Sequence, residues 1–261
     1  MQSIQHGIVV NDYHKLFEGI PAVSGISFEV QPGQILGLIG PNGAGKTTTM
    51  RTISALIAPT NGSLSVAGLN VELDPVAVKR RLAYVPDDPK LFPHLTVEEH
   101  LAFAAAAYRV EDADRKATEL LRIFELTDKR KVAAKDLSRG MRQKLAICSA
   151  YLYDPVAILF DEPLTGLDPH GIRMLKQSML DRAADGAAVM VSSHLLAMVE
   201  DICTHILLLH QGQQKFFGTV DELKTQFVNS DDEASLERIF FLATGQSDTK
   251  LHSQMHATSA S

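Results

Sequence analysis

The chain has 261 residues, 45% of them hydrophobic and 21% charged, which is enough for one large domain or two small ones around a sizeable core. Its 25 Lys and Arg against 31 Asp and Glu give a formal net charge of −6. This acidic balance argues against nucleic acid as a partner, because phosphate binding needs a basic surface. The two cysteines, Cys148 and Cys203, are too few for a disulfide framework or a zinc cluster, and we expect buried free thiols in a reducing cytosol.

Apolar runs in the sequence are short. A membrane-spanning helix needs about 20 consecutive apolar residues, whereas the longest runs here are residues 101–108 and 156–160. Residues 1–10 lack the basic segment and long apolar stretch of a secretory signal. We therefore expect a cytoplasmic chain with no direct membrane span.

Along the chain, short apolar runs alternate with longer helical patterns, which is typical of an α/β protein with a largely parallel sheet. Residues 26–30 and 63–66 alternate polar and apolar side chains and predict half-exposed antiparallel strands near the N-terminus. The remaining runs are mostly apolar throughout and predict strands buried on both faces. These runs are residues 35–39, 82–85, 156–160, 188–192 and 206–209.

The middle of the chain, residues 96–153, changes to a succession of helices. Thr96 and Glu99 are spaced as a capping box that opens a helix over 97–108. Apolar residues recur at helical spacing over 113–124. The sequence therefore predicts a helical insertion between strands.

These patterns divide the chain into three parts. We predict a main domain over residues 1–227, with the helical subdomain inserted at about 88–153. Residues 228–243 are expected to form a short C-terminal helical extension. Residues 244–261 are rich in Ser and Thr without periodicity, so we expect a flexible tail.

A phosphate-binding motif, G-x-x-x-x-G-K-[ST], lies between the predicted strand at 35–39 and a helix expected over 47–56. It consists of Gly40, Pro41, Asn42, Gly43, Ala44, Gly45, Lys46 and Thr47, and Thr48 continues the site. Glycines let the backbone wrap around phosphate oxygens, and the amides at the helix start point at the anion. We expect Lys46 to reach the β- and γ-phosphates of ATP and Thr47 to offer its hydroxyl to Mg²⁺. A glycine-rich turn without a ligand is the alternative.

Two adjacent carboxylates, Asp161 and Glu162, follow the apolar run at 156–160. Such a pair is often only a solvated turn, but the preceding phosphate loop favours a catalytic role. Asp161 is then expected to hold Mg²⁺, and Glu162 to polarise the water that attacks the γ-phosphate.

With these motifs placed, residues 4–225 resemble the nucleotide-binding (ATPase) subunit of ATP-binding cassette (ABC) transporters. The discriminating segment is 137–143, Leu-Ser-Arg-Gly-Met-Arg-Gln, which resembles the family's signature loop, commonly L-S-G-G-Q. Ser138 is a natural N-cap for the helix that follows. The resemblance implies that Ser138 and Gly140 contact the γ-phosphate of an ATP held by a second subunit. Arg139 replaces the usual first glycine, as in the export-type, ABC-2-like branch.

The resemblance extends to four further positions. Phe17 corresponds to the aromatic residue that stacks on adenine, with core packing as the alternative. Asp168 lies in the loop that couples the two sites of a dimer, and it can also cap a helix. His194 matches the switch histidine that contacts the γ-phosphate and completes a catalytic set with Glu162 and Lys46. Asp87 stands where the family usually has a glutamine that ligates Mg²⁺, and whether it is a ligand stays open.

The resemblance implies an α/β fold: a P-loop NTPase core with a mixed, mainly parallel sheet, an N-terminal antiparallel β subdomain and an inserted helical subdomain. It also implies an ATPase that binds ATP and Mg²⁺ in an ATP-sandwich dimer, which we expect to be a homodimer. This dimer powers a separate transmembrane permease subunit, in the export direction, from the inner face of the membrane. The docking surface for the permease is expected at residues 88–95, although Leu91, Phe92 and Pro93 of this segment could instead pack inward.

Two alternatives remain from other classes. A non-transport ABC ATPase acting on DNA or ribosomes would carry long coiled coils or a second cassette, and the sequence has neither. A regulatory binding module with impaired hydrolysis is motivated by Arg139 and Asp87. The lysine, carboxylates and histidine needed for hydrolysis are nevertheless all present.

Overall fold

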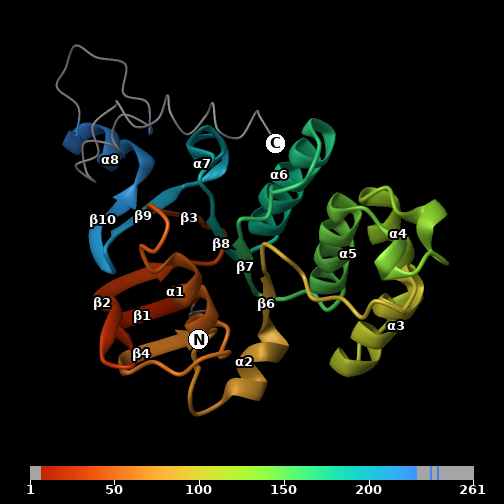
Figure 1. Cartoon of the computed structure of the whole chain (residues 1–261), viewed down its shortest axis with the longest axis horizontal. Coiled ribbons are helices and arrows are strands. Elements are labelled where there is room, and N and C mark those ends of the chain that lie inside the picture. Colours follow the sequence, from red (N-terminus) through yellow and green to blue (C-terminus); the bar gives the residue numbers. More distant parts are fainter. Residues whose placement is uncertain (1–6, 228–235, 237–239, 241–261) are drawn as a thin grey trace, which may run out of the picture.

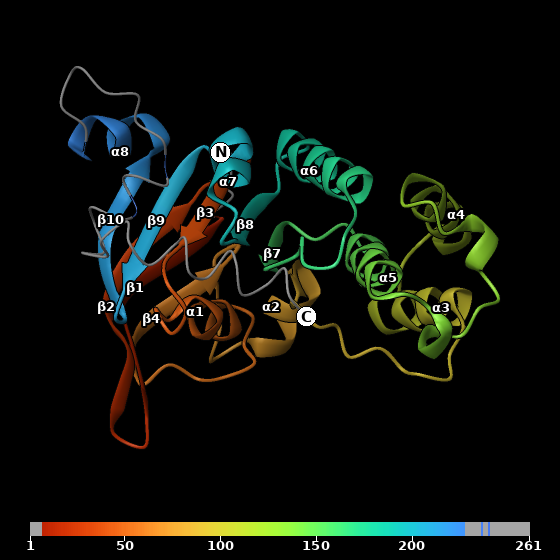
Figure 2. The same cartoon turned by 45° about the horizontal axis from the view of Figure 1, so that its top comes forward.

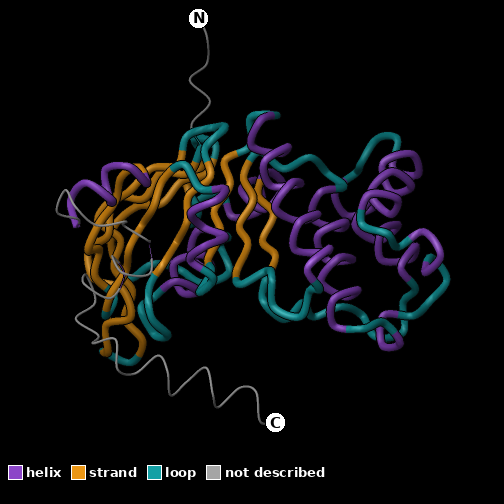
Figure 3. The backbone as a smooth tube through the Cα atoms, turned by 90° about the horizontal axis from the view of Figure 1, so that it is seen from above, coloured by secondary structure: helices purple, strands orange, loops and turns teal. Residues whose placement is uncertain are grey.

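The computed structural model describes residues 7–227, 236 and 240 (Figure 1). This part contains two sheets and a group of helices that lies to one side of them, and Figure 3 shows the strands gathered at one end of the molecule. Most of the predicted extension at 228–243 and all of the predicted tail at 244–261 lie outside the described residues. Within the described residues, no helix is long and apolar enough to cross a membrane.

The larger sheet has six strands in the order β10-β9-β3-β8-β7-β6. Neighbouring strands pair in parallel, except β9 and β10, which are antiparallel. The strands are β3 (Ile35–Ile39), β6 (Leu82–Val85), β7 (Ala157–Asp161), β8 (Ala188–Ser192), β9 (His205–His210) and β10 (Gln213–Thr219). The mixed, mainly parallel sheet predicted from the sequence is therefore confirmed.

Hydrophobic cores cover both faces of this sheet. In β3, Ile35 and Ile39 belong to one core, whereas Leu36 and Leu38 belong to the other. Because successive side chains of a strand point to opposite faces, a strand between two cores must be apolar at every position. This double burial explains the uninterrupted apolar runs of the sequence.

The smaller sheet has four antiparallel strands in the order β2-β1-β4-β5. They are β1 (Ile8–Phe17), β2 (Ile20–Val30), β4 (Asn61–Val66) and β5 (Leu69–Asn70). Strands β1 and β2 form a hairpin whose end projects from the molecule (Figure 2). Its two-residue loop, Glu18 and Gly19, has positive φ at both positions, which matches the twist of paired strands. The predicted antiparallel N-terminal sheet is confirmed, although the sequence patterns missed β1 and the first half of β2.

Three helices between β6 and β7 in sequence form the separate helical group in Figures 1 and 2: α3 (Val97–Tyr108), α4 (Ala113–Ile123) and α5 (Arg139–Tyr151). Short 3₁₀ turns at Thr127–Lys129 and Ala134–Asp136 join α4 to α5. The remaining helices are α1 (Lys46–Ile53), α2 (Pro75–Arg81), α6 (Pro169–Ala184), α7 (Leu196–Ile202) and α8 (Val220–Phe227).

The capping box predicted for α3 is present. The Thr96 hydroxyl accepts a hydrogen bond from the Glu99 amide at 3.3 Å, and the Glu99 carboxylate accepts one from the Thr96 amide at 2.7 Å. Two amides that the first turn would leave without partners are thereby satisfied. The start of α3 was predictable because this signal is purely local.

Several predicted boundaries were wrong. Helix α1 ends at Ile53 rather than at residue 56, and Ala55, two residues on, has a φ of 54°, which a right-handed helix cannot include. Strand β7 runs one residue further than expected and includes Asp161. Both cysteines are free and buried as predicted.

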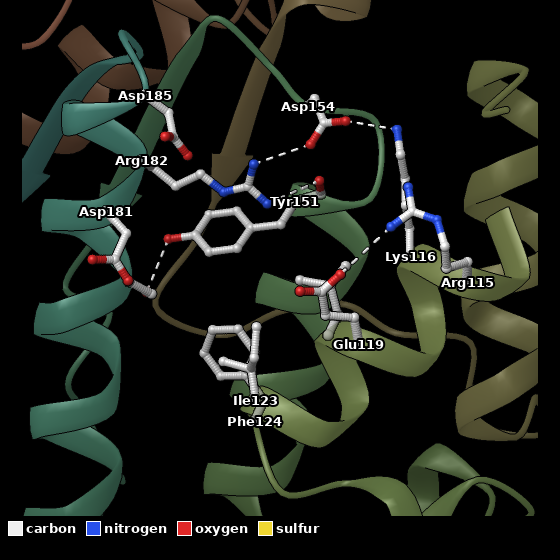
Figure 4. A pocket seen from close by; sticks show the side chains of 12 residues that line it. Arg115, Lys116, Glu119, Ile123, Phe124, Tyr151, Asp154, Asp181, Arg182 and Asp185 are labelled. Atoms are coloured by element: carbon white, nitrogen blue, oxygen red, sulfur yellow. Dashed lines mark hydrogen bonds and ion pairs between the residues drawn. The ribbon is translucent and has the colours of Figure 1, made fainter. Parts of the chain in front are cut away.

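A cavity of about 360 Å³ lies where α4 meets α5 and α6 (Figure 4). At its rim, Asp154 accepts hydrogen bonds from Lys116 of α4 at 2.6 Å and from Arg182 of α6 at 3.0 Å. The Arg182 guanidinium also lies 4.4 Å from the centre of the Tyr151 ring. Asp154 therefore ties the helical group to the helix that packs on the large sheet.

Candidate active site

The candidate site forms at the carboxyl ends of β3, β8 and β7, which are neighbours in the sheet. The phosphate loop follows β3, His194 comes shortly after β8, and Asp161 ends β7. Parallel strands end at one edge of their sheet, so residues that are far apart in sequence meet there. The structure thus brings together four of the predicted site residues, Lys46, Asp161, Glu162 and His194.

The phosphate loop needs glycine for steric reasons at two positions. A Cβ on Gly40 would lie 2.3 Å from the carbonyl oxygen of Leu209, which is closer than any real contact. Gly45 caps α1 with a φ of 100°, a conformation that disfavours every residue with a Cβ. Both glycines let the loop turn sharply and lead its amides into the N-terminus of α1, the part of a helix that attracts anions.

Lys46 is the first residue of α1, and its side chain is only 9% exposed. Its ammonium group donates hydrogen bonds to the carbonyl oxygens of Gly40 at 2.7 Å and Pro41 at 3.3 Å. Burial lowers the pKa of Lys46, and the negative charges of Glu162 and Asp161 oppose that shift. Lysine and both carboxylates therefore share one electrostatic environment. Thr47 and Thr48 follow in the first turn of α1 and are partly buried.

Asp161 is 4% exposed and accepts two hydrogen bonds from hydroxyl groups. Ser192 donates to its Oδ1 at 2.7 Å, and Tyr84 donates to its Oδ2 at 3.1 Å. Burial and the nearby Asp161 charge raise the pKa of Tyr84 to about 12. The two hydroxyls hold the carboxylate in one orientation, as outer partners of metal ligands commonly do.

Ser192 and Tyr84 were missed as site residues in the sequence analysis. Each lies on a strand that flanks β7, and Ser192 pairs in register with Asp161. A hydroxyl residue within an otherwise apolar predicted strand was the available signal. These hydroxyl residues can be assigned to the site only when the order of the strands in the sheet is known.

Glu162 and His194 form a hydrogen-bonded pair. The Oε2 of Glu162 lies 2.8 Å from Nδ1 of His194 and accepts a second bond from the His194 amide at 3.2 Å. The backbone of Glu162 has a φ of 49°, and its amide donates to the Ser192 hydroxyl at 3.0 Å. A left-handed glutamate is uncommon and costs conformational energy, which is typical of residues held in place for function.

The predicted signature residues lie at the start of α5. The Ser138 hydroxyl caps this helix by accepting from the Met141 amide at 3.2 Å, and the Ser138 residue is exposed. A Cβ on Gly140 would lie 2.9 Å from the carbonyl oxygen of Gly166, so glycine allows the first turn of α5 to approach the loop before α6. Gly140 thus has a structural role in addition to its predicted phosphate contact.

Asp168 caps a helix, and Phe17 lies at the surface. Asp168 caps α6 by accepting from the Gly171 amide at 2.7 Å, which is the helix-cap role. Phe17 ends β1 with 47% of its side chain exposed, and the Lys15 ammonium lies 5.0 Å from its ring centre. The ring is therefore not an ordinary core side chain.

Asp87 is engaged by another side chain. Its Oδ1 accepts a hydrogen bond from the Arg139 guanidinium at 3.0 Å. Arg139 would therefore compete with Mg²⁺ for the Asp87 carboxylate. No sequence pattern indicated this ion pair.

The donor set fits Mg²⁺. The ion prefers hard oxygen ligands and usually takes one or two from the protein, with waters and substrate phosphates completing the octahedron. The buried carboxylate of Asp161, oriented by two hydroxyls, and the hydroxyl of Thr47 beside the phosphate loop are such ligands. These two residues could therefore hold the metal.

Comparisons with known proteins identify the family of this chain. A family model described as "ABC transporter" matches residues 23–165, just over half of the chain. The ABC-type transporter ATP-binding protein EcsA of Bacillus subtilis (strain 168) is 37% identical over 86% of this chain and 91% of its own length. The Nod factor export ATP-binding protein I of Cupriavidus metallidurans is 31% identical over 82% of this chain and 71% of its own length.

A solved structure of an ATP-binding subunit of an ABC transporter superposes with a TM-score of 0.86 at 36% identity, covering 90% of this chain and 98% of that one. A nucleotide-free ATP-binding cassette at 22% identity has the same fold, with a TM-score of 0.73 over 84% of this chain and 94% of that one. The chain belongs to the ABC transporter family, in which it is an ATP-binding subunit and an ATPase.

Proposed function

We propose that this subunit hydrolyses ATP with Mg²⁺ in an ATP-sandwich homodimer and drives export through a separate transmembrane permease subunit. The pairing of Glu162 with His194, beside Lys46 and Asp161, carries the catalytic part of this proposal. In this arrangement the chain works at the inner face of the membrane and is held there by its partner.

The residues divide the chemistry between them. Lys46 neutralises the β- and γ-phosphates of ATP, and the glycine loop surrounds them with amides. A Mg²⁺ ion held by Asp161 and Thr47 would supply further charge stabilisation for the departing phosphate. Glu162 orients the attacking water and accepts its proton. Because Nδ1 of His194 faces Glu162, Nε2 is the ring nitrogen that remains for the γ-phosphate.

Support for the dimer comes from the signature residues at the start of α5. Ser138 is exposed at the N-terminus of α5, a helix end that favours negative charge. This turn can therefore complete the ATP site of a second copy. The export direction rests on Arg139 in the signature loop and on relatives such as the Nod factor export protein.

A groove of about 510 Å³ suits the permease contact. It lies between α3 and the loop after β6, and Phe92 and Phe103, both more than half exposed, line it. The loop is held in place by His100, whose Nε2 accepts from the Phe92 amide at 3.0 Å. The half-exposed Phe92 favours the docking role over inward packing. An amphipathic helix of the permease could bury these rings.

The catalytic assignment is tested with Glu162→Gln. This isosteric change removes the proton acceptor, so we expect kcat to fall at least about 100-fold while the affinity for ATP changes less than about two-fold. Phosphate release and fluorescent-nucleotide binding give the two values, and Glu119→Gln on the surface of α4 is the control. Near-normal hydrolysis by Glu162→Gln would contradict the assignment, and ATP binding without hydrolysis by the unaltered protein would favour the regulatory module.

The docking assignment is tested with Phe92→Asp. A charge in the apolar groove should abolish co-purification with the proposed permease subunit, because the carboxylate would have to be desolvated in the interface. Leu180→Asp, at a similarly exposed apolar position on α6, is the control. Undiminished co-purification of the Phe92 variant would show that the permease binds elsewhere.

A further inference from the structure

The two residues that depart from the family pattern, Asp87 and Arg139, are bound to each other at 3.0 Å across 52 positions of sequence. We propose that Arg139 is a positioning residue. Through its bond with Asp87 it holds the signature turn, residues 138–140 at the start of α5, next to the docking loop, residues 88–95. Displacement of this loop by the partner then moves Ser138 and Gly140. This relay rests on the proposed function, because it joins the proposed docking loop to the proposed dimer contact.

Arg139 is badly placed for the stability of its own helix. It is the first residue of α5, where the positive end of the helix dipole repels a cation. The carboxylate of Asp87 offsets this repulsion, and the two side chains are similarly exposed, at 50% and 49%. The two departures from the family pattern therefore compensate each other.

The stem of Arg139 lies across a second loop. A Cβ on Gly166 would lie 2.8 Å from Cδ and 3.1 Å from Cγ of Arg139, and Gly166 has a φ of 82°. The carbonyl oxygen of Gly166 is also the atom that Gly140 approaches. Arg139 thus connects the loop after β6, the first turn of α5 and the loop that leads to Asp168.

A second bond runs alongside the ion pair. Gln143, one helical turn after Arg139, is 1% exposed, and its side-chain amide donates to the carbonyl oxygen of Pro86 at 3.4 Å. Residues four apart lie on the same face of a helix, so one face of α5 holds both Pro86 and Asp87. The docking segment at 88–95 follows Asp87 directly in the sequence. A displacement of that segment would therefore reach the signature turn through only these two bonds.

The relay also gives Asp87 a role. Its Oδ1 is occupied by Arg139, and the metal ligands oriented by buried partners are found elsewhere, at Asp161. We therefore assign Asp87 as the counter-ion of Arg139.

The test is a double-mutant cycle on the purified chain without nucleotide. Asp87→Asn and Asp87→Lys should each speed hydrogen exchange at the amides of residues 139–145 by roughly three-fold, the size expected for a half-exposed ion pair. Arg139→Met and Arg139→Glu also relieve the repulsion from the helix dipole, so they should speed this exchange less. Arg139→Lys and the double variant Asp87→Lys with Arg139→Glu should restore slow exchange. The exposed pair Arg115 and Glu119 on α4, 3.8 Å apart, gives a matched charge-swap control that leaves these amides unchanged.

ATP turnover separates a positioning role from a purely structural one. Asp87→Asn and Arg139→Met should lower kcat several-fold with an unchanged ATP affinity, and the swapped pair should recover most of it. Strictly additive single effects in hydrogen exchange would overturn the relay. An increased Mg²⁺ requirement in Asp87→Asn alone would overturn it as well, because Asp87 would then be a metal ligand. Hydrogen exchange is measured without nucleotide, so failure of the proposed ATPase mechanism would not affect that result.

Discussion

At the scale of single residues, the site is organised around one buried carboxylate. Asp161 sits between the hydroxyls of Ser192 and Tyr84, and Ser192 also accepts from the Glu162 amide. A single serine therefore helps to position both the predicted metal ligand and the predicted base. Its loss should affect stability and catalysis together.

We predict that Ser192→Ala lowers the free energy of unfolding by about 1–3 kcal/mol, because it leaves the buried Oδ1 of Asp161 without its hydroxyl donor. The Glu162 amide keeps its bond to the carbonyl oxygen of residue 192 at 3.2 Å. The substitution should also lower kcat, since Asp161 and Glu162 lose a common support. Urea unfolding and steady-state phosphate release measure the two effects. Ser149→Ala removes a hydroxyl that only bonds to the preceding helical turn, and it should change neither quantity by a comparable amount. Equal behaviour of the two variants would refute the positioning role of Ser192.

At the scale of elements, Asp154 is one link between the helical group and α6, because it receives bonds from Lys116 of α4 and Arg182 of α6. Burial by itself would raise the pKa of Asp154, but the hydrogen bonds and charges of Lys116 and Arg182 outweigh it and hold the pKa below its usual 3.8. A carboxyl group whose folded-state pKa is depressed stabilises the fold at higher pH and loses that effect on acidification.

We predict that Asp154→Asn destabilises the protein by about 1 kcal/mol or less at pH 7, because the half-exposed ion pairs are screened by solvent. The loss of unfolding free energy relative to the unaltered protein should be greatest above the ordinary pKa of an aspartate. It should shrink as the pH falls below about 4, through the lowered folded-state pKa. Unfolding measured across this pH range checks the sign. Asp185→Asn lines the same cavity without taking part in these two ion pairs and should show no such trend. A difference that grows on acidification would contradict the ion-pair account.

At the scale of the whole molecule, the two halves of the proposed ATP site lie on different parts of the chain. The phosphate loop belongs to the large sheet, whereas the exposed Ser138 begins a helix of the separate helical group (Figure 2). Two copies could therefore exchange these surfaces around ATP in an isologous dimer, the commonest symmetry of homo-oligomers.

We predict that Glu162→Gln forms a stable dimer in the presence of ATP and Mg²⁺, visible as a doubled mass in light scattering. Adding Ser138→Asp should abolish it, because aspartate still caps α5 but places a negative charge beside the phosphates. Thermal unfolding checks that the cap is kept. An undiminished dimer of the double variant would show that the signature turn does not face the nucleotide.

The features that could be predicted from the sequence are mostly local motifs. The phosphate loop, the acidic pair at the end of β7, the cap of α5 and the capping box of α3 can each be recognised from neighbouring residues. Strand β1 was missed because its register shifts between Val10 and Lys15, which breaks the alternation that marks a strand. The end of α1 was placed too late because the positive φ at Ala55 has no marker such as glycine.

From the sequence alone we predicted a phosphate-binding loop between a strand and a helix, a sheet buried on both faces and a resemblance to ABC ATPases. The tertiary structure alone decided which distant residues act together: Glu162 with His194 across 32 positions, Asp161 with Ser192 across 31, and Asp87 with Arg139 across 52. The physical reason is strand order. A local pattern specifies that a strand ends in a polar residue, whereas only the packing of the whole sheet specifies which other strand ends beside it.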